Sequence, residues 1–356
     1  MMTSPALAAV ALDSSESGGG IAVVTELLWA VLQHAFGSRA RLIALLPGGH
    51  PTPSFIDKVR FGTKLVQAQV AGRTDWILFS HLALAKAQTG LPSRLRVPYG
   101  VFLHGIEAWC PLSTREQQIL RDADVRLSNS AYTAGRVMSA HPDIGEVIAC
   151  PLALPPAATQ DACALSFDPG PHAVLVVGRM SAGEQYKGHD QLLEAWGFVL
   201  AQIPDARLIV AGGGDDLPRL RAKAATLGID HTVIFTGFVS AAILNELYRR
   251  SALFALPSRG EGFGLVYLEA MRAGLPCVGS IHDAAGEVIR DGDTGCLVDQ
   301  ADIPGIATTL SRLLADAPLR ARMGAAGRTR VNDMFSFDRF ERQLLGVLNA
   351  PQGVAP

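Results

Sequence analysis

The sequence lacks the residue patterns that mark metal centres and disulfide frameworks. Its five cysteines lie far apart without a Cys-x-x-Cys pair, and none of its nine histidines belongs to a His-Glu-x-x-His motif. Scattered cysteines of this kind are typical of a reducing compartment, and they supply no metal signature.

Net charge and long apolar runs are also low. The 356 residues carry a formal net charge of −2, which argues against a general nucleic-acid binder. No positively charged segment precedes the first apolar stretch, so we expect no signal peptide. No uninterrupted apolar run reaches the roughly 18 residues that span a bilayer. We expect a cytoplasmic protein that is at most peripheral on the cytoplasmic face of the membrane.

Charge is nevertheless distributed unevenly along the chain. Residues 57–96 contain seven basic and two acidic residues, a local excess of five positive charges. The simpler interpretation is a solvated face, since charged side chains usually lie in water. The alternative is a surface for an anionic acceptor or an anionic membrane. The basic residues are Lys58, Arg60, Lys64, Arg73, Lys86, Arg94 and Arg96.

Apolar residues and glycine are abundant. Apolar residues make up 49% of the chain, and 36 residues are glycine. A chain of this length is long enough for two domains. Many glycines suit an α/β protein with tight turns between strands and helices. The proline-rich segment 150–171 is the best candidate for a linker between the domains.

Strands and helices are predicted to alternate along both halves. We expect strands at 6–12, 41–46, 76–79, 97–103, 125–127, 173–177, 206–211, 232–236, 253–256 and 276–279. We expect helices at 18–36, 130–139, 188–202, 217–227, 240–250 and 264–273. This alternation predicts parallel sheets covered by helices. Such sheets bind ligands at the carboxyl ends of their strands.

The leading candidate site is the segment Glu261–Glu269, which follows a predicted strand and opens a helix. Gly262 and Gly264 leave room for backbone N–H groups to approach an anion, and the helix start adds partial positive charge. Glu261 and Glu269 can accept hydrogen bonds from sugar hydroxyls. The alternative is a capped helix with two solvated glutamates.

Two basic residues, Arg179 and Lys187, follow the predicted strand 173–177, the first strand after the proline-rich segment. Arginine offers a planar fork for phosphate oxygens, and lysine offers a compact charge. Together they can stabilise a departing nucleoside diphosphate without a metal ion. The alternative is a pair of exposed basic side chains with no shared role.

Three further signals follow strands and are weaker. His104 can donate to a sugar hydroxyl or share charge with a leaving group, or it is an ordinary buried histidine. Gly18-Gly19-Gly20 opens the first helix and suits an anion, or it is a flexible turn. Gly212-Gly213-Gly214 is a weak dinucleotide-like signal, and a turn that needs positive φ explains it more simply.

The order and spacing of these motifs resemble glycosyltransferase family 4, a group of retaining enzymes with the GT-B fold. The resemblance is strong over residues 173–300 and thinner in the N-terminal half. The matching motifs are Gly18-Gly-Gly20, His104-Gly-Ile-Glu-Ala-Trp109, Ser128-Asn-Ser-x2-Thr133, Gly178-Arg179, Tyr186-Lys187-Gly188, Phe235-Thr-Gly-Phe238, Pro257-Ser258, Glu261-Gly-Phe-Gly-x4-Glu269-Ala-Met and Gly292-x2-Gly295-x-Leu-Val298. The chain departs from the family by its short length and by the small loop Met180–Gln185, which leave the acceptor side uncertain.

The resemblance implies two Rossmann-like, doubly wound parallel-sheet domains facing each other across a cleft. It implies an acceptor-side domain at 1–165, a nucleotide-sugar donor domain at 166–335, and a C-terminal helix at 336–356 that returns toward the first domain. No metal ion or other cofactor is implied.

The resemblance also implies roles for individual residues. Arg179 and Lys187 would bind the donor diphosphate, Glu261 would hold the donor sugar, and Glu269 would hold the ribose. His104 would contact the transferred sugar. The remaining donor-binding residues implied by the match are Gly19, Gly20, Gly178, Phe238, Gly262, Phe263, Gly264 and Leu265.

The expected activity is transfer of a sugar from a GDP-mannose or UDP-glucose type donor to a hydroxyl acceptor, with retention of the anomeric configuration. A lipid-linked acceptor in polysaccharide or glycolipid assembly is one option. A GT-B sugar-nucleotide epimerase and a non-catalytic nucleotide-binding module remain alternatives. An NAD-dependent oxidoreductase is disfavoured, because no Gly-x-Gly-x-x-Gly follows the first strand.

Overall fold

The chain folds into two compact units, each built on a six-stranded sheet. The computed structural model describes residues 2–9, 19–46, 53–155 and 163–349. Unit 1 comprises Met1–Pro155 together with Phe337–Pro356, and unit 2 comprises Pro156–Ser336. The division falls inside the proline-rich segment 150–171.

The sheet of unit 1 is entirely parallel, in the order β2-β1-β3-β4-β5-β6. Its strands are β1 Pro5–Ala9, β2 Arg41–Ala44, β3 Trp76–Phe79, β4 Tyr99–Leu103, β5 Val125–Ser128 and β6 Ile148–Ala149. The chain passes from β1 to β2 on one side and then continues from β3 on the other. The carboxyl edge between β1 and β3 is therefore a topological switch point, the usual place for a ligand.

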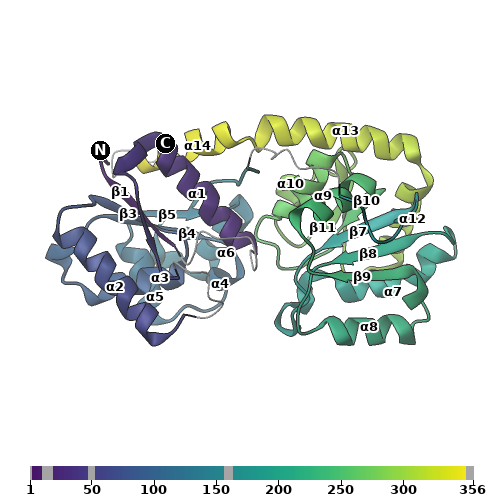
Figure 1. Cartoon of the computed structure of the whole chain (residues 1–356), viewed down its shortest axis with the longest axis horizontal. Coiled ribbons are helices and arrows are strands. Elements are labelled where there is room, and N and C mark those ends of the chain that lie inside the picture. Colours follow the sequence, from purple (N-terminus) through teal and green to yellow (C-terminus); the bar gives the residue numbers. More distant parts are fainter. Residues whose placement is uncertain (1, 10–18, 47–52, 156–162, 350–356) are drawn as a thin grey trace. The chain divides into compact units, whose positions relative to one another are not determined.

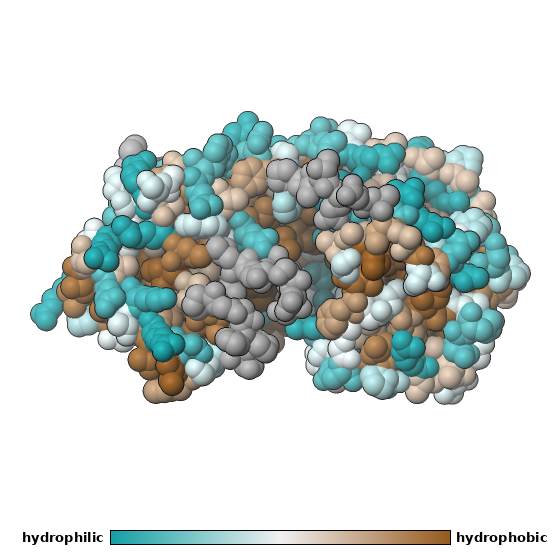
Figure 2. All heavy atoms as spheres, viewed as in Figure 1, coloured by the Kyte–Doolittle hydropathy of each residue, from teal (hydrophilic) through white to brown (hydrophobic). Residues whose placement is uncertain are grey.

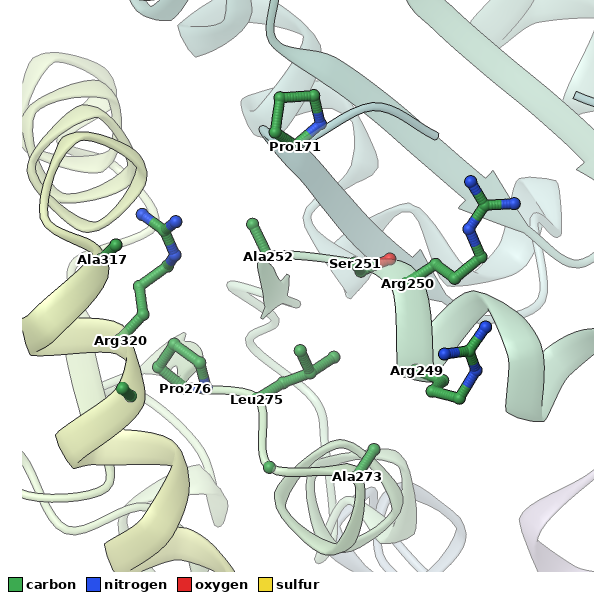
Figure 3. Close-up of a pocket in the computed structure, with 12 residues that line it drawn as sticks. Pro171, Arg249, Arg250, Ser251, Ala252, Ala273, Leu275, Pro276, Ala317 and Arg320 are labelled. Carbon is green, nitrogen blue, oxygen red and sulfur yellow. The ribbon is translucent and has the colours of Figure 1, made fainter. Parts of the chain in front are cut away.

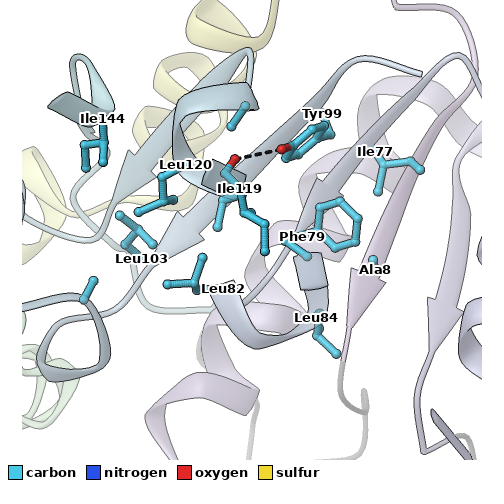
Figure 4. Packing of buried hydrophobic residues seen from close by; sticks show 14 of the residues in the cluster. Ala8, Ile77, Phe79, Leu82, Leu84, Tyr99, Leu103, Ile119, Leu120 and Ile144 are labelled. Atoms are coloured by element: carbon cyan, nitrogen blue, oxygen red, sulfur yellow. Dashed lines mark hydrogen bonds between the residues drawn. The ribbon is translucent and has the colours of Figure 1, made fainter. Parts of the chain in front are cut away.

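In the described part of unit 1, α-helices cover this sheet (Figure 1). They are α1 Gly20–Phe36, α2 Phe55–Val70, α3 Leu82–Ala85, α4 Ile106–Trp109, α5 Thr114–Asp122, α6 Ala131–Ala140 and the C-terminal α14 Phe337–Asn349. Figure 4 shows the core between the sheet and these helices, where the rings of Phe79 and Tyr99 meet edge to face. The hydroxyl of the buried Tyr99 donates to the carbonyl of Ile119 at 2.7 Å, so its polar end is satisfied.

The sheet of unit 2 is also parallel, in the order β12-β11-β10-β7-β8-β9. Its strands are β7 Ala173–Val177, β8 Arg207–Ala211, β9 Val233–Gly237, β10 Leu253–Ala255, β11 Cys277–Ser280 and β12 Gly295–Val298. Numbered within the unit, this is the Rossmann order 3-2-1-4-5-6. The switch point lies between β7 and β10.

Helices lie on both faces of the second sheet in Figure 1. They are α7 His189–Leu200, α8 Leu217–Thr226, α9 Ala241–Arg250, α10 Leu265–Ala273, α11 Ala285–Val288, α12 Ile303–Ala315 and α13 Ala317–Met334. The predicted α/β class with doubly wound parallel sheets is thus confirmed in both units.

Among the described residues, one helix is long and apolar enough to cross a membrane by length and composition, namely Gly20–Arg39, in which α1 continues into a 3-10 turn. No uninterrupted apolar run marks this helix in the sequence, because polar residues interrupt the stretch. In the structure, α1 contacts β1 and buries Leu27, Leu28 and Val31 in unit 1. A core helix with one buried face passes the same test of length and composition.

Candidate functional site

The switch point of unit 2 is formed by the loops that follow β7 and β10. The first loop ends at Gly188, whose φ of +86° suits glycine, and a Cβ there would lie 2.4 Å from the carbonyl oxygen of Pro257 in the second loop. Gln300, which is 4% exposed, donates to the carbonyls of Tyr186 at 2.9 Å and Pro257 at 2.7 Å. Close approach and a buried amide thus hold the two loops together.

Lys187 lies between carboxylates from both loops. Its Nζ is 3.7 Å from Glu261 Oε2 and 4.0 Å from Glu184 Oε2. The three side chains are only 18–22% exposed, so their charges interact more strongly than on an open surface. The structure therefore brings together two residues that the sequence placed in one site, Lys187 and Glu261, and adds Glu184.

Arg179 reaches the same group of charges from the end of β7. Its Nε donates to Glu184 at 3.1 Å, and its Nη2 also pairs with Glu184. This hydrogen bonding raises the pKa of the Arg179 guanidinium further above its ordinary value. Arg179 is 64% exposed and remains accessible to a ligand. The sequence missed Glu184 because it lies in Met180–Gln185, which was treated as a small insertion.

Helix α10 begins at this edge, immediately after Gly264. Gly264 has a φ of +91°, and a Cβ there would lie 2.3 Å from the Tyr267 ring, so the turn needs glycine. The first N–H groups of the helix have no intrahelical partner and carry partial positive charge. The geometry fits the predicted anion-binding role for the backbone of Gly262, Phe263, Gly264 and Leu265, a role that remains a prediction.

A buried aspartate holds the Glu261 backbone in place. Asp283 follows β11 and accepts hydrogen bonds from the N–H groups of Ala285 at 3.0 Å and Glu261 at 3.2 Å. Burial raises the pKa of the Asp283 carboxyl to about 7, although these hydrogen bonds act in the opposite direction. Asp283 was not among the predicted site residues, although its position just after a strand was an available signal.

Glu269 lies farther along α10 and is separated from the charges around Lys187. Its Oε2 accepts from the hydroxyl of Tyr248, a residue of α9 that is 3% exposed, at 2.8 Å. Burial raises the pKa of the Glu269 carboxyl. Glu261 and Glu269 therefore lie in different surroundings, in agreement with separate predicted roles.

The three glycines after β8 serve close packing. A Cβ on Gly212 would lie 2.1 Å from the carbonyl oxygen of Gly178, and one on Gly214 would lie 1.9 Å from that of Met180. Phe238 packs against Gly213 and is 78% exposed, at the carboxyl end of β9. These contacts favour the turn interpretation of Gly212–Gly214 over a dinucleotide motif.

His189, the first residue of α7, is a buried polar group that the sequence did not single out. It is 6% exposed, and its Nε2 has no hydrogen-bond partner within the described residues. Burial, with a smaller contribution from Lys187, lowers the pKa of His189 to about 4, so the imidazole is neutral near pH 7. Its ring lies beside Gly178, where a Cβ would be 3.7 Å from Nε2.

In unit 1, two histidines lie at the carboxyl edge of the sheet. The rings of His81, after β3, and His104, after β4, stack with centroids 5.7 Å apart. His104 Nε2 is 2.6 Å from the carbonyl oxygen of Ser80, so Nε2 carries the proton and Nδ1 is left as an acceptor. Burial lowers the pKa of both histidines. With this tautomer, Nδ1 can accept a hydrogen bond from a hydroxyl group. The tautomer disfavours the two roles suggested by the sequence, in which His104 donates to a sugar hydroxyl or shares charge with a leaving group.

The glycine-rich start of α1 is only partly described, since Gly18 lies outside the described residues. Gly19 is the N-cap of α1 and Gly20 its first residue. Nothing lies within 4 Å of a Cβ built on either, so this helix start is open. Elsewhere within residues 2–9, 19–46, 53–155 and 163–349, no group of three His, Cys, Asp or Glu side chains is placed to hold a metal ion.

The sequence of this chain is similar to those of known glycosyltransferases. Residues 162–330 match the family described as Glycosyl transferases group 1. The chain is 35% identical over 248 residues to the GDP-mannose-dependent alpha-(1-6)-phosphatidylinositol monomannoside mannosyltransferase of Mycolicibacterium smegmatis. That alignment covers 63% of this chain and 63% of the relative, so the chain spans less than two thirds of the relative's length.

Solved structures extend the likeness to almost the whole chain. The sucrose-phosphate synthase of Thermosynechococcus elongatus has a TM-score of 0.77 at 21% identity, over 97% of this chain and 98% of that one. Anabaena Alr3699/HepE in complex with UDP has a TM-score of 0.73 at 20% identity, over 97% and 99%. These similarities confirm the GT-B fold. Residues 162–330, which contain the charged site at β7 and β10, therefore match the group 1 glycosyltransferases, and the fold agrees with these solved structures along almost the whole chain.

Proposed function

We propose that this protein transfers a sugar, with retention of anomeric configuration, from a nucleoside diphosphate sugar to a hydroxyl acceptor. The observation that carries the proposal is the position of Lys187, whose Nζ lies between Glu184 and Glu261 at the switch point. A cation at the carboxyl edge of a Rossmann sheet, beside a helix start, is suited to a diphosphate. The motif resemblance supports the same assignment.

In the proposed reaction, the bond between the anomeric carbon and the diphosphate oxygen breaks. The acceptor oxygen forms the new bond on the same face of the sugar, and its proton passes to a diphosphate oxygen. Negative charge develops on the departing diphosphate, where Lys187, Arg179 and the start of α10 can stabilise it. Fixed cations and backbone dipoles stabilise such charge without reorganising during the reaction.

The two glutamates take different parts in this proposal. Glu261 is beside Lys187 and is assigned the hydroxyls of the donor sugar. Glu269 keeps one carboxylate oxygen on Tyr248 and is assigned the ribose through the other. Phe238 offers an exposed ring at the same edge of the sheet for donor binding. In unit 1, His104 is assigned a sugar hydroxyl, which its unprotonated Nδ1 can accept from.

Donor identity is testable by thermal shift with GDP-mannose, UDP-glucose and UDP-N-acetylglucosamine. A ligand that binds only the folded chain raises the unfolding temperature by mass action. We propose that GDP-mannose or UDP-glucose gives the largest shift, in line with the mannosyltransferase relative. Absence of a shift with any donor would count against the whole assignment.

Turnover then separates the alternatives. Donor hydrolysis, or transfer to a hydroxyl acceptor, supports the transferase. An epimer formed from the donor alone would support an epimerase instead. Binding without turnover against a broad acceptor panel would support a non-catalytic module.

We further propose that unit 1 contacts an anionic membrane through α2, where a lipid-linked acceptor would be found. Large apolar side chains on α2 are exposed to solvent: Phe55 by 80%, Ile56 by 59%, Val59 by 50% and Val70 by 58%. Figure 2 shows apolar and hydrophilic surface side by side over α2, at the lower left. Such a helix can insert its apolar residues at the level of lipid headgroups.

The charges on α2 complement an anionic surface. Lys58, Arg60 and Lys64 are exposed, and within the described part of the chain none of them forms an ion pair. By contrast, Lys86 pairs with Glu116 and Arg96 with Asp122, so these members of the basic stretch 57–96 are engaged inside unit 1. The basic surface available to a membrane therefore contains fewer residues than the basic stretch 57–96.

Sedimentation with vesicles tests this contact. We expect binding to phosphatidylglycerol-containing vesicles that is lost in Phe55→Ser/Ile56→Ser and weakened in Lys58→Gln/Arg60→Gln/Lys64→Gln. Phe198→Ser is the matched control, because Phe198 is 57% exposed on α7. Equal binding by the double serine variant and the original chain would refute the contact.

A further inference from the structure

At the amino ends of the strands of unit 2, opposite the switch-point loops, the structure contains a polar pocket. Its volume is about 350 Å³, within the range of small-molecule sites. It lies where β7, β10 and β11 begin, between the carboxyl ends of α9 and α10 and the start of α13. Nothing in the proposed transfer reaction uses it.

Three arginines line this pocket, and no acidic residue does. Figure 3 shows Arg320, from α13, on one side and Arg249 and Arg250, from α9, on the other, with Ala252 and Leu275 between them. The walls between the arginines are small: Ala252, Ala273, Gly274, Ala317 and Ala321. Short side chains leave space that the three guanidinium groups border.

Each guanidinium uses some of its N–H donors in hydrogen bonds within the protein and has other N–H donors left over. Arg249 uses Nε and Nη2 on Glu246, and Arg250 uses Nη2 on Asp168. Arg320 donates through Nη1 to the carbonyls of Leu313 and Leu314 at the end of α12. Within the described residues, no hydrogen bond occupies Nη1 of Arg249 or Nε and Nη2 of Arg320.

The partners outside the pocket offset only part of its charge, since Glu246 pairs with Arg249 and Asp168 pairs with Arg250. Asp168 is 77% exposed, so its ion pair with Arg250 is largely screened by water. Arg320 has no carboxylate within salt-bridge distance among the described residues, and burial lowers the pKa of its guanidinium. A partly buried arginine with unused donors is stabilised by an anion that approaches them.

From this arrangement we infer that the Arg249–Arg250–Arg320 pocket is a binding site for a compact phosphate-bearing anion, separate from the donor site. Phosphate oxygens accept from guanidinium groups in paired hydrogen bonds, which suits three arginines around one space. The pocket also borders α10 at Ala273 and Gly274, and the same helix starts at the proposed donor site. An anion here is therefore placed to influence the other end of α10.

The test titrates the full chain with inorganic pyrophosphate at constant ionic strength, with and without saturating GDP or UDP, and follows binding by calorimetry. We expect pyrophosphate to bind even when the nucleotide is saturating. Arg250→Gln/Arg320→Gln should weaken that binding about tenfold or more, since a hydrogen bond to a charged group contributes about 1.5–3 kcal/mol. Arg322→Gln is the matched control, because Arg322 is exposed on α13 and does not line the pocket.

Single variants are also needed, because Arg320 donates to the end of α12 and its replacement can disturb folding. Arg250→Gln removes only an exposed ion pair and should fold normally while weakening pyrophosphate binding. Loss of all pyrophosphate binding when nucleotide is added would overturn the inference, as would equal losses in Arg322→Gln and Arg250→Gln. If no nucleotide binds at all, the proposed function fails, but the pyrophosphate titration of these variants still decides on the pocket.

Discussion

The two units carry similar parallel sheets, yet the carboxyl edges of those sheets hold different polar groups. In unit 2 the edge holds Arg179 and Lys187 with Glu184 and Glu261, four charges in close pairs. In unit 1 the corresponding histidine pair is stacked, and burial keeps it neutral. The same backbone architecture is thus compatible with an edge suited to a charged phosphate group and an edge suited to neutral hydroxyls.

Among the variants that test the difference between the two edges, replacement of Lys187 should have the largest effect. We expect Lys187→Ala to lower kcat by about 10²–10³, the usual loss when one preorganised donor to a developing oxyanion is removed. Lys223→Ala is the control, because Lys223 also pairs with two carboxylates, Asp190 and Glu194, but lies on α8. Near-normal kcat in Lys187→Ala would show that the charged edge does not drive the chemistry.

His189 is a neutral residue near the charged edge of unit 2, and we expect its burial to affect the pH dependence of the free energy of unfolding. Its folded-state pKa of about 4 lies below the ordinary histidine value of 6.5, so the unfolded chain binds the extra proton as pH falls. Stability from this group is therefore present above pH 6.5 and is lost as pH falls toward 4, by about 3 kcal/mol.

Comparison with His189→Phe isolates this contribution, since other groups such as Asp283 titrate in both proteins. Denaturant unfolding between pH 4.5 and 7.5 should show the original chain losing stability relative to the variant at low pH. Parallel curves for the two proteins would mean that His189 is not held neutral by burial.

The two glutamates can be separated by kinetics. We expect Glu261→Gln to lower kcat by about tenfold or more, because the lost hydrogen bonds are to the reacting sugar. Glu269→Gln should raise the KM for the donor about tenfold and leave kcat nearly unchanged, because the ribose does not react. The reverse pattern would exchange the two roles.

The smallest effect is expected at the neutral edge. His104→Ala should lower kcat/KM by about two- to tenfold, in line with one neutral hydrogen bond. Because burial lowers the pKa of His104 below its ordinary value, the imidazole is neutral at pH 7 to 8, and kcat/KM should not fall over that range through this group. His231→Ala, at an exposed site in unit 2, is the control. A loss of kcat/KM near pH 6.5 that disappears in His104→Ala would contradict the neutral tautomer.

The sequence predicted most strands to within two residues, because buried apolar runs ended by glycine or proline are strong local signals. It also placed the start of α6 to within one residue, since the helix predicted at 130–139 has Ser130 as its N-cap, whose hydroxyl accepts from the N–H of Thr133. It missed α2 and α5, although both begin with a readable capping box, Ser54 with Asp57 and Ser113 with Glu116.

The proximity of Lys187 and Glu261 was predictable for a similar reason. Lys187 and Glu261 follow neighbouring strands, and parallel topology brings such positions to one edge. Glu184 and His189 were missed because their importance depends on ion pairing and on a buried, unpartnered nitrogen. Neither property follows from residue type or spacing, since both arise only when the loops pack.

Unit 1 is discontinuous, because it combines Met1–Pro155 with Phe337–Pro356. Helix α14 joins this unit at the end of the chain, and His34 on α1 lies 2.7 Å from Glu341 on α14. During synthesis, all of unit 2 leaves the ribosome before α14 does, although domains generally fold as units from the N-terminus. The unit that begins the chain is therefore the last to be completed, and a C-terminal truncation would damage the N-terminal unit.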